Sequence, residues 1–96
     1  MLILITYDVS TTDKAGQRRL RRVAQACKDY GVRVQKSVFE CRVGPAQWAS
    51  LRHRLLKEIK PEEDSLRFYY LDETAVKRIE HHGAAQPIDL TEPLIL

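Results

Sequence analysis

The strongest constraint on the fold is a short apolar run at the start of the chain. Residues Leu2 to Ile5 are four consecutive aliphatic side chains, and the β-branched Thr6 follows them. Such a run is typical of a strand buried on both faces, so it predicts a central strand of a sheet. The run stops at Asp8, which places a carboxylate at the edge of the core. That place suits a metal ligand or a general base, although capping a helix or pairing with an arginine is the commoner role for a carboxylate there.

Two amphipathic helices are predicted from apolar residues at helical spacing. The first follows the capping residues 11–13 and ends at Gly31, and its apolar stripe consists of Leu20, Val23, Ala24, Cys27 and Tyr30. The second begins at Pro45 and ends at Pro61, and its stripe consists of Trp48, Leu51, Leu55, Leu56 and Ile59. The aromatic-rich segment 66–71 predicts a further strand.

The segment between the two helices predicts a β-hairpin. Its alternating apolar residues are Val32 and Val34, and then Phe39 and Cys41 at the opposite parity. A two-residue turn at positions 36–37 brings both sets to one face, because Val34 then pairs with Phe39 and Val32 with Cys41. Lys-Ser is not a favoured turn dipeptide, so a single bulged strand is the alternative.

The resulting order over residues 1–71 is β-α-β-β-α-β, which predicts an α+β protein with the ferredoxin-like fold. In that fold an antiparallel sheet carries both helices on one face. The chain has 96 residues and predicts a single domain over 1–96. After the core, segment 75–82 fits either a short helix or another strand. The tail 87–96 ends in apolar residues, which we expect to dock on this domain or on a partner.

The charge of the chain is unevenly distributed. The formal net charge is +3, but residues 1–48 hold nine Lys and Arg against four Asp and Glu, whereas residues 49–96 hold seven against nine. The basic side chains of the first predicted helix include Lys14, Arg18, Arg19, Arg21 and Arg22. Such a cluster favours a nucleic-acid partner over a membrane, and the alternative is a plain solvated helix face.

The composition also predicts a cellular compartment. The apolar opening is too short to cross a bilayer and lacks the pattern of a secretion signal. The two cysteines, Cys27 and Cys41, are far apart in sequence and form no CxxC pair. Both observations favour free thiols in a cytoplasmic protein with no membrane partner.

Three stretches together resemble the CRISPR-associated Cas2 family, the small subunit of the spacer-acquisition complex. They are Ile5-Thr6-Tyr7-Asp8-Val9-Ser10, the arginine-rich helix closed by Gly31, and Arg33-Val34-Gln35-Lys36-Ser37-Val38-Phe39-Glu40. The first stretch alone is weak, whereas its combination with the third is specific. The resemblance runs in order from Met1 through Leu71.

The resemblance implies a ferredoxin-like homodimer with strand exchange. In the family, a segment after the fourth core strand forms an extra strand that crosses to the partner's sheet. Here that segment lies near Lys77-Arg78-Ile79-Glu80, so residues 72–96 are predicted to supply an extra strand and an exchanged or docked tail. In the acquisition complex the family's dimer bridges two dimers of the integrase subunit and holds pre-spacer DNA.

The resemblance also implies site residues. The aspartate that matches Asp8 comes from both protomers near the twofold axis, where the pair can bind a divalent cation, usually Mg²⁺. Some members are described as metal-dependent endonucleases on single-stranded RNA or duplex DNA, through the general route of metal-assisted hydrolysis. Tyr7 would then orient the site, Ser37 would donate or accept a hydrogen bond, Arg33 would bind phosphate, and Phe39 matches a further motif position. The basic residues of the first helix would contact nucleic acid.

Three functions follow from these residues. The first is a scaffold in CRISPR spacer acquisition, and the second is a Mg²⁺-dependent endonuclease that uses paired Asp8 residues. The third sets the CRISPR role aside and takes the chain as a VapD-like ribonuclease toxin or a non-catalytic ferredoxin-like nucleic-acid-binding module. The sequence does not determine whether two Asp8 carboxylates approach closely enough to share a metal, because that distance depends on the dimer.

Overall fold

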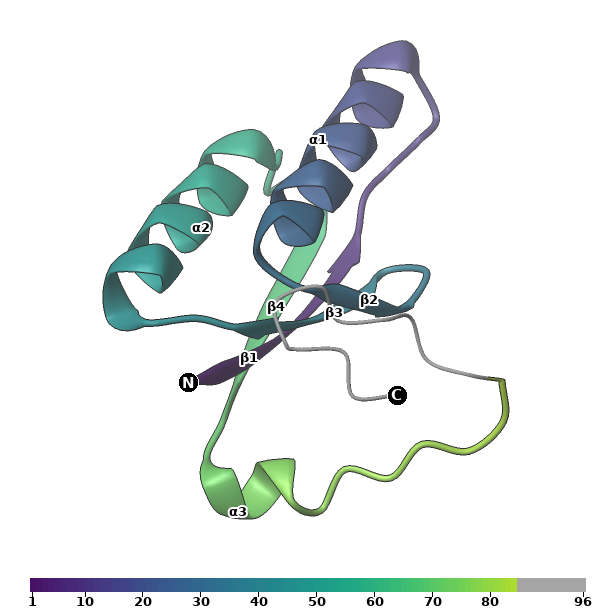
Figure 1. The fold of residues 1–96 in the computed structure, drawn as a ribbon. Coiled ribbons are helices and arrows are strands. Elements are labelled where there is room, and N and C mark those ends of the chain that lie inside the picture. Colours follow the sequence, from purple (N-terminus) through teal and green to yellow (C-terminus); the bar gives the residue numbers. More distant parts are fainter. Residues whose placement is uncertain (85–96) are drawn as a thin grey trace.

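The chain folds into one four-stranded antiparallel sheet covered on one face by two helices (Figure 1). The computed structural model describes residues 1–84. Its elements are β1 (Leu2–Asp8), α1 (Lys14–Tyr30), β2 (Val32–Gln35), β3 (Val38–Arg42), α2 (Pro45–Glu58), β4 (Ser65–Leu71) and α3 (Glu73–Val76). The strand order is β2-β3-β1-β4. The predicted ferredoxin-like α+β fold is therefore confirmed.

The apolar opening of the chain forms the central strand, as predicted. β1 lies between β3 and β4, and its residues Ile3 and Ile5 are fully buried under the helices. They belong to one apolar core with Val23 and Cys27 of α1 and with further residues of α2 and β3. Because the strand has neighbours on both edges and a helical layer on one face, its backbone is held firmly up to its last residue.

The predicted hairpin between β2 and β3 is confirmed, but its predicted register is wrong by one residue. Arg33 pairs with Phe39, Val32 pairs with Glu40, and a bulge separates Arg33 from Gln35. The alternation of apolar residues does not reveal such a bulge. One extra residue in the strand moves the side chains before it to the opposite face of the sheet. The consequence is that Arg33 shares the helix-facing side of the sheet with Phe39.

This strand register requires a glycine at position 31. A Cβ atom at Gly31 would clash with the Cys41 sulfur and the Glu40 carbonyl oxygen of β3. The backbone at Gly31 is extended, with φ −159°, so the residue ends α1 through close packing and not through a left-handed conformation.

The region after β4 differs from the predicted extra strand. Asp72 caps the short helix α3 by accepting a hydrogen bond from the Ala75 backbone N–H at 2.8 Å. Within the described part of the chain, residues 77–84 contain no strand. Residues 77–84 pair with none of the described strands, and strand exchange with a second chain stays a prediction. The predicted apolar tail, 87–96, lies outside the described residues, and no helix within 1–84 is long and apolar enough to cross a membrane.

A buried carboxylate joins the ends of three elements. Asp64, just before β4, accepts hydrogen bonds from Arg19 Nε of α1 at 2.8 Å, from the Ser10 N–H at 3.1 Å and from the Lys60 N–H at 2.8 Å. The Asp64 side chain is fully buried and that of Arg19 is 14% exposed. The Arg19 guanidinium, with support from the two backbone N–H groups, lowers the pKa of Asp64 from 3.8 to about 2.

We predict that Asp64→Asn lowers the free energy of unfolding at pH 7 by about 2 kcal/mol, because it removes a charge-assisted hydrogen-bond acceptor from a partly buried arginine. The folded-state pKa lies below the unfolded one, so this stabilisation is fully present above about pH 4 and is lost as the pH falls toward about 2. Urea unfolding at several pH values measures it. Glu62→Gln, an exposed carboxylate in the same loop, is the matched control, expected to cost less than about 0.5 kcal/mol. A difference between Asp64→Asn and wild type that stays constant from pH 7 to pH 2 would contradict this account.

Candidate functional site

The predicted site residues lie on opposite faces of the sheet. Because side chains alternate along β1, Tyr7 points toward the helices and is 6% exposed, whereas Asp8 is exposed on the helix-free side. Arg33 and Phe39 lie with Tyr7 on the helix side. A single chain therefore does not bring the predicted catalytic residues together at one point.

Asp8 is an isolated carboxylate at the end of the central strand. It pairs across the sheet with Ser65 of β4, and within residues 1–84 its side chain has no hydrogen bond or ion pair. Both of its oxygens are thus available as hard ligands of the kind that Mg²⁺ prefers. The described residues contain no group of three or more His, Cys, Asp or Glu side chains that could hold a metal. A metal bound at Asp8 would need further ligands from water, substrate or a second chain.

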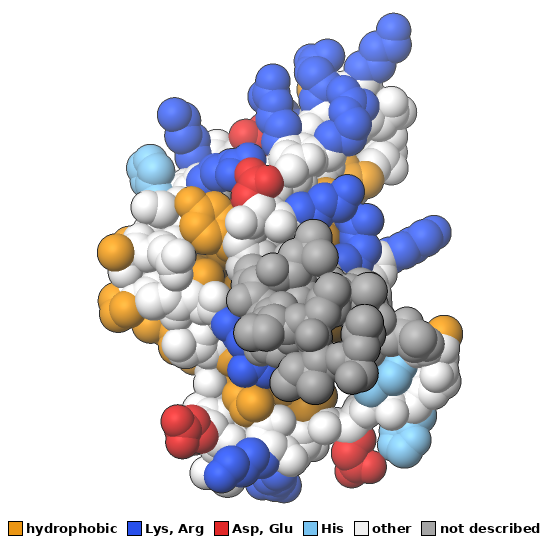
Figure 2. Space-filling model, in the orientation of Figure 1, with side chains coloured by type: hydrophobic (Ala, Val, Ile, Leu, Met, Phe, Trp, Pro, Cys, Tyr) orange, Lys and Arg blue, Asp and Glu red, His pale blue; other side chains and the backbone are white. Residues whose placement is uncertain are grey.

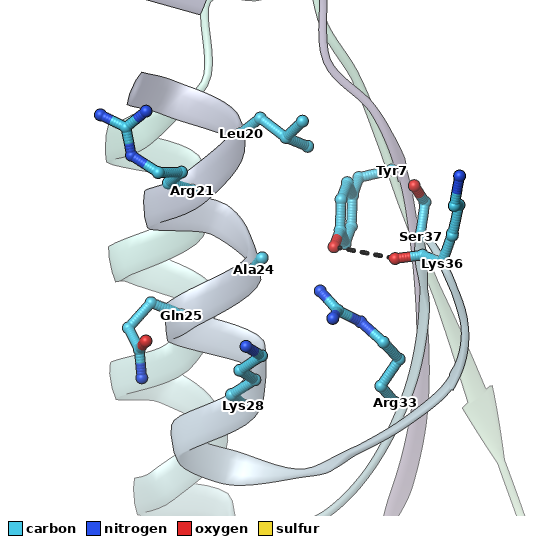
Figure 3. A pocket seen from close by; sticks show the side chains of 9 residues that line it. All are labelled: Tyr7, Leu20, Arg21, Ala24, Gln25, Lys28, Arg33, Lys36 and Ser37. Atoms are coloured by element: carbon cyan, nitrogen blue, oxygen red, sulfur yellow. Dashed lines mark hydrogen bonds between the residues drawn. The ribbon is translucent and has the colours of Figure 1, made fainter. Parts of the chain in front are cut away.

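On the other face, a pocket opens between α1 and the β2–β3 hairpin (Figure 3). This α1–hairpin pocket has a volume of about 540 Å³ and is lined by Tyr7, Leu20, Arg21, Ala24, Gln25, Lys28, Arg33, Lys36 and Ser37. Four of these side chains are cationic and none is acidic. Three predicted catalytic residues, Tyr7, Arg33 and Ser37, therefore share one pocket with a predicted nucleic-acid-binding residue, Arg21.

Tyr7 forms the inner wall of this pocket. Its hydroxyl donates to the Lys36 carbonyl oxygen at a long 3.4 Å, and its backbone N–H donates to the Ser37 carbonyl oxygen at 3.1 Å. Burial raises the pKa of the Tyr7 phenol above its usual value of 10.0, and the adjacent Arg33 guanidinium offsets part of that effect. Tyr7 is therefore a protonated hydrogen-bond donor at neutral pH and not a general base.

The aromatic ring of Phe39 packs against the guanidinium of Arg33. The Phe39 ring is fully buried, so it offers no surface to a base or a sugar, and its part in any site is indirect. The guanidinium carbon of Arg33 lies 5.0 Å from the centroid of that ring, a cation–π distance. The Nε atom of Arg33 is buried and has no hydrogen-bond partner among residues 1–84.

The basic residues of α1 divide into free and paired side chains. Lys14, Arg18 and Arg21 are exposed, and Arg22 is 67% exposed although it pairs with Glu58 at 3.3 Å. Arg19 differs because its guanidinium is held by Asp64, so it is not part of the basic surface. Figure 2 shows Lys and Arg side chains gathered over the part of the molecule that carries α1 and α2.

Two cationic residues of the pocket were not among the predicted site residues. Lys28 lies seven residues after Arg21, which is two helical turns, so helical spacing could have found it. Lys36 lies within the hairpin motif, but its position at the rim depends on the turn and the bulge, which the sequence does not specify.

Comparison with known proteins places the chain in a family. The family model described as CRISPR associated protein Cas2 matches residues 1–79. A protein of Nitratidesulfovibrio vulgaris named CRISPR-associated endoribonuclease Cas2 is 62% identical over 96 residues, which cover 100% of this chain and 94% of that protein. A Chlorobaculum tepidum protein of the same name is 58% identical over the full length of both chains. A CRISPR-associated endonuclease Cas2 of Halalkalibacterium halodurans is 53% identical over 99% of each chain.

Solved structures agree with the sequence relatives. The crystal structure of Streptococcus pyogenes Cas2 at pH 6.5 superimposes with a TM-score of 0.75 and 51% identity, covering 86% of this chain and 100% of that one. The hypothetical protein TT1823 of Thermus thermophilus gives a TM-score of 0.70 at 31% identity, over 92% of this chain and 95% of that one. From its sequence motifs, its fold and these relatives, the chain belongs to the CRISPR-associated Cas2 family.

Proposed function

We propose that this protein is a CRISPR-associated nuclease whose active form is a homodimer with a divalent cation, Mg²⁺, held between the Asp8 side chains of two chains. The observation that carries the proposal is the free, exposed Asp8 carboxylate on rigid backbone at the end of β1. The names of the relatives, endoribonuclease and endonuclease, support the nuclease assignment.

The helix-free face of the sheet supports the homodimer. Strand alternation puts Leu4, Val38, Tyr69 and Leu71 on the same face as Asp8. Neither α1 nor α2 covers this face (Figure 1). A second copy that packs its own face here would bury apolar side chains and bring another Asp8 toward the first. One or two carboxylates with water and substrate oxygens are a common ligand set for Mg²⁺.

Each group in the proposed reaction has one task. Bound Mg²⁺ would lower the pKa of a water molecule and offset the charge that develops on the phosphodiester. Asp8 would hold the cation at the end of the central strand β1. Exposed side chains such as Arg18 and Arg22 hold the nucleic-acid backbone without reading its sequence. Tyr7 is a positioning residue, because its hydroxyl donates a hydrogen bond to the Lys36 carbonyl oxygen and so ties the end of β1 next to Asp8 to the hairpin.

We also propose the role in spacer acquisition that the family resemblance implies. There the dimer would bridge two dimers of the integrase subunit and hold pre-spacer DNA on its basic surface. The helical layer with Lys14, Arg18, Arg21 and Arg22 supports the DNA-holding part of this role. Residues 1–84 show no feature that favours the VapD-like toxin or the non-catalytic binding module.

We predict that Asp8→Asn reduces Mg²⁺-dependent cleavage of single-stranded RNA or duplex DNA by about 100-fold or more, because an amide is a much weaker ligand than a carboxylate. The assay uses labelled substrates with Mg²⁺ and with a chelator. Binding of the same substrates should stay within about twofold of wild type, since Asp8 lies away from the α1 arginines. Glu62→Gln controls for the loss of one surface carboxylate.

Two outcomes would count against the shared Mg²⁺ site. Chelator-sensitive cleavage that survives Asp8→Asn would place the metal elsewhere. Wild-type protein that binds DNA but cuts neither substrate would leave the scaffold role alone.

We predict that Arg18→Gln weakens DNA binding and reduces the slope of log K against log salt by about 1, as expected for one lost phosphate contact. Arg19→Gln is the matched comparison, with the same charge change on the same helix. Because Arg19 is held by Asp64, its loss should lower the unfolding free energy and leave the salt slope nearly unchanged. Salt titrations by fluorescence anisotropy measure both variants. The reverse pattern, with the slope reduced only by Arg19→Gln, would contradict the assignment of the basic surface.

A further inference from the structure

The α1–hairpin pocket concentrates positive charge without an acidic partner. Arg21 and Lys28 of α1, Arg33 of β2 and Lys36 of the turn after β2 all line it, and Figure 3 shows the Arg33 guanidinium pointing toward α1. Within residues 1–84, the side chains of Arg21, Lys28 and Lys36 form no ion pair. The neighbouring carboxylate of Asp29 is engaged elsewhere, by Gln25 at 2.8 Å and Arg54 at 2.8 Å. Like charges that line one pocket repel one another, and a bound anion would offset that repulsion.

The pocket also presents hydrogen-bond donors that have weak partners or none. Arg33 Nε is buried without a hydrogen-bond partner among the described residues, which is unusual for a guanidinium. The Tyr7 hydroxyl donates one long hydrogen bond of 3.4 Å to the Lys36 carbonyl oxygen, and the Ser37 side chain has none within residues 1–84. An anion with several oxygens could accept hydrogen bonds from these groups and from the cations together.

We infer that the α1–hairpin pocket binds a terminal phosphate monoester, the phosphorylated end of a nucleic-acid strand. A monoester carries close to two negative charges at neutral pH, whereas each internal phosphodiester carries one, so four cations favour the end over the backbone. The volume of about 540 Å³ is in the range of small-molecule sites, enough for a nucleotide-sized group. Leu20 and Ala24 give one wall an apolar surface that suits a sugar or a base.

The position of the pocket fits a strand end and not only a free ligand. Arg21 belongs both to the pocket and to the exposed arginines of α1, so a strand lying along α1 can enter the pocket with its terminus. The pocket and Asp8 lie on opposite faces of the sheet, which makes the pocket a second site of the protein, separate from the proposed metal. This inference rests on the proposed nucleic-acid-binding function and adds to it a preference for phosphorylated ends.

The test compares three versions of one short labelled oligonucleotide, with a 5′-phosphate, with a 3′-phosphate and with no terminal phosphate. The full-length protein is used in chelator, so that cleavage does not interfere. We expect wild type to bind at least one phosphorylated version about tenfold more tightly than the unphosphorylated one, the scale of a few charge-assisted hydrogen bonds. We expect Lys36→Gln and Arg21→Gln each to lower that ratio to about threefold or less. Lys36 is an exposed turn residue, so its substitution leaves the fold intact.

Arg18→Gln is the matched control. It removes the same charge from the same helix at a position outside the pocket, so it should weaken all three oligonucleotides equally and leave the ratio unchanged. Competition with a nucleoside 5′-monophosphate and with inorganic phosphate distinguishes the source of the phosphate. If millimolar nucleoside monophosphate abolishes the preference for phosphorylated oligonucleotides, the pocket also binds free nucleotides. If the preference persists, the pocket binds the phosphate only as part of a nucleic-acid strand.

Two results would overturn the inference. One is equal affinity of wild type for phosphorylated and unphosphorylated ends while binding stays salt-dependent, which would leave the proposed function in place and remove only the pocket's role. The other is a preference that Lys36→Gln and Arg21→Gln leave intact, which would place the phosphate site elsewhere. Absence of any nucleic-acid binding would instead contradict the proposed function itself.

Discussion

The register of the β2–β3 hairpin is the constraint on which the rest of the structure depends. Gly31 packs so closely on Cys41 that a side chain at position 31 would clash with the Cys41 sulfur. The bulge between Arg33 and Gln35 shifts the pairing by one residue, so that Gln35 pairs with Val38 next to the turn. This register turns Arg33 inward, over the ring of Phe39 and beside Tyr7. A shift of one residue would move Arg33 to the helix-free face and remove from the pocket the cation that the described strands contribute to it.

Alternation along β1 then separates two kinds of chemistry. Tyr7 faces the helices and a pocket rich in cations, whereas Asp8 faces away from the helices and carries a free carboxylate. One face suits anions and the other suits a divalent cation. One strand therefore carries two proposed sites, and in the proposed homodimer a second Asp8 would add to the ligands of the metal.

The sequence predicted the order of the elements, the central strand, the hairpin turn and the exposed Asp8, because these depend on local periodicity and on a specific motif. It did not predict the hairpin register, because the alternation of apolar residues along the sequence does not reveal a β-bulge. It also did not predict the pairing of Arg19 with Asp64, which are 45 residues apart and meet only in the folded chain. The segment after β4 was ambiguous for a different reason: its structure depends on which strand, if any, lies next to it, and α3 is what forms in the single chain.

The most direct test of the central claim, that two Asp8 carboxylates from two chains form one metal-dependent active site, is a mixing experiment. Wild-type and Asp8→Asn chains are co-refolded in varied ratios at fixed total protein, and Mg²⁺-dependent cleavage is measured at each ratio. If both carboxylates are required, activity follows the square of the wild-type fraction, so an equal mixture retains about one quarter of full activity. Activity that falls in proportion to the wild-type fraction, to about one half in the equal mixture, would show that each Asp8 acts alone and would contradict the shared site.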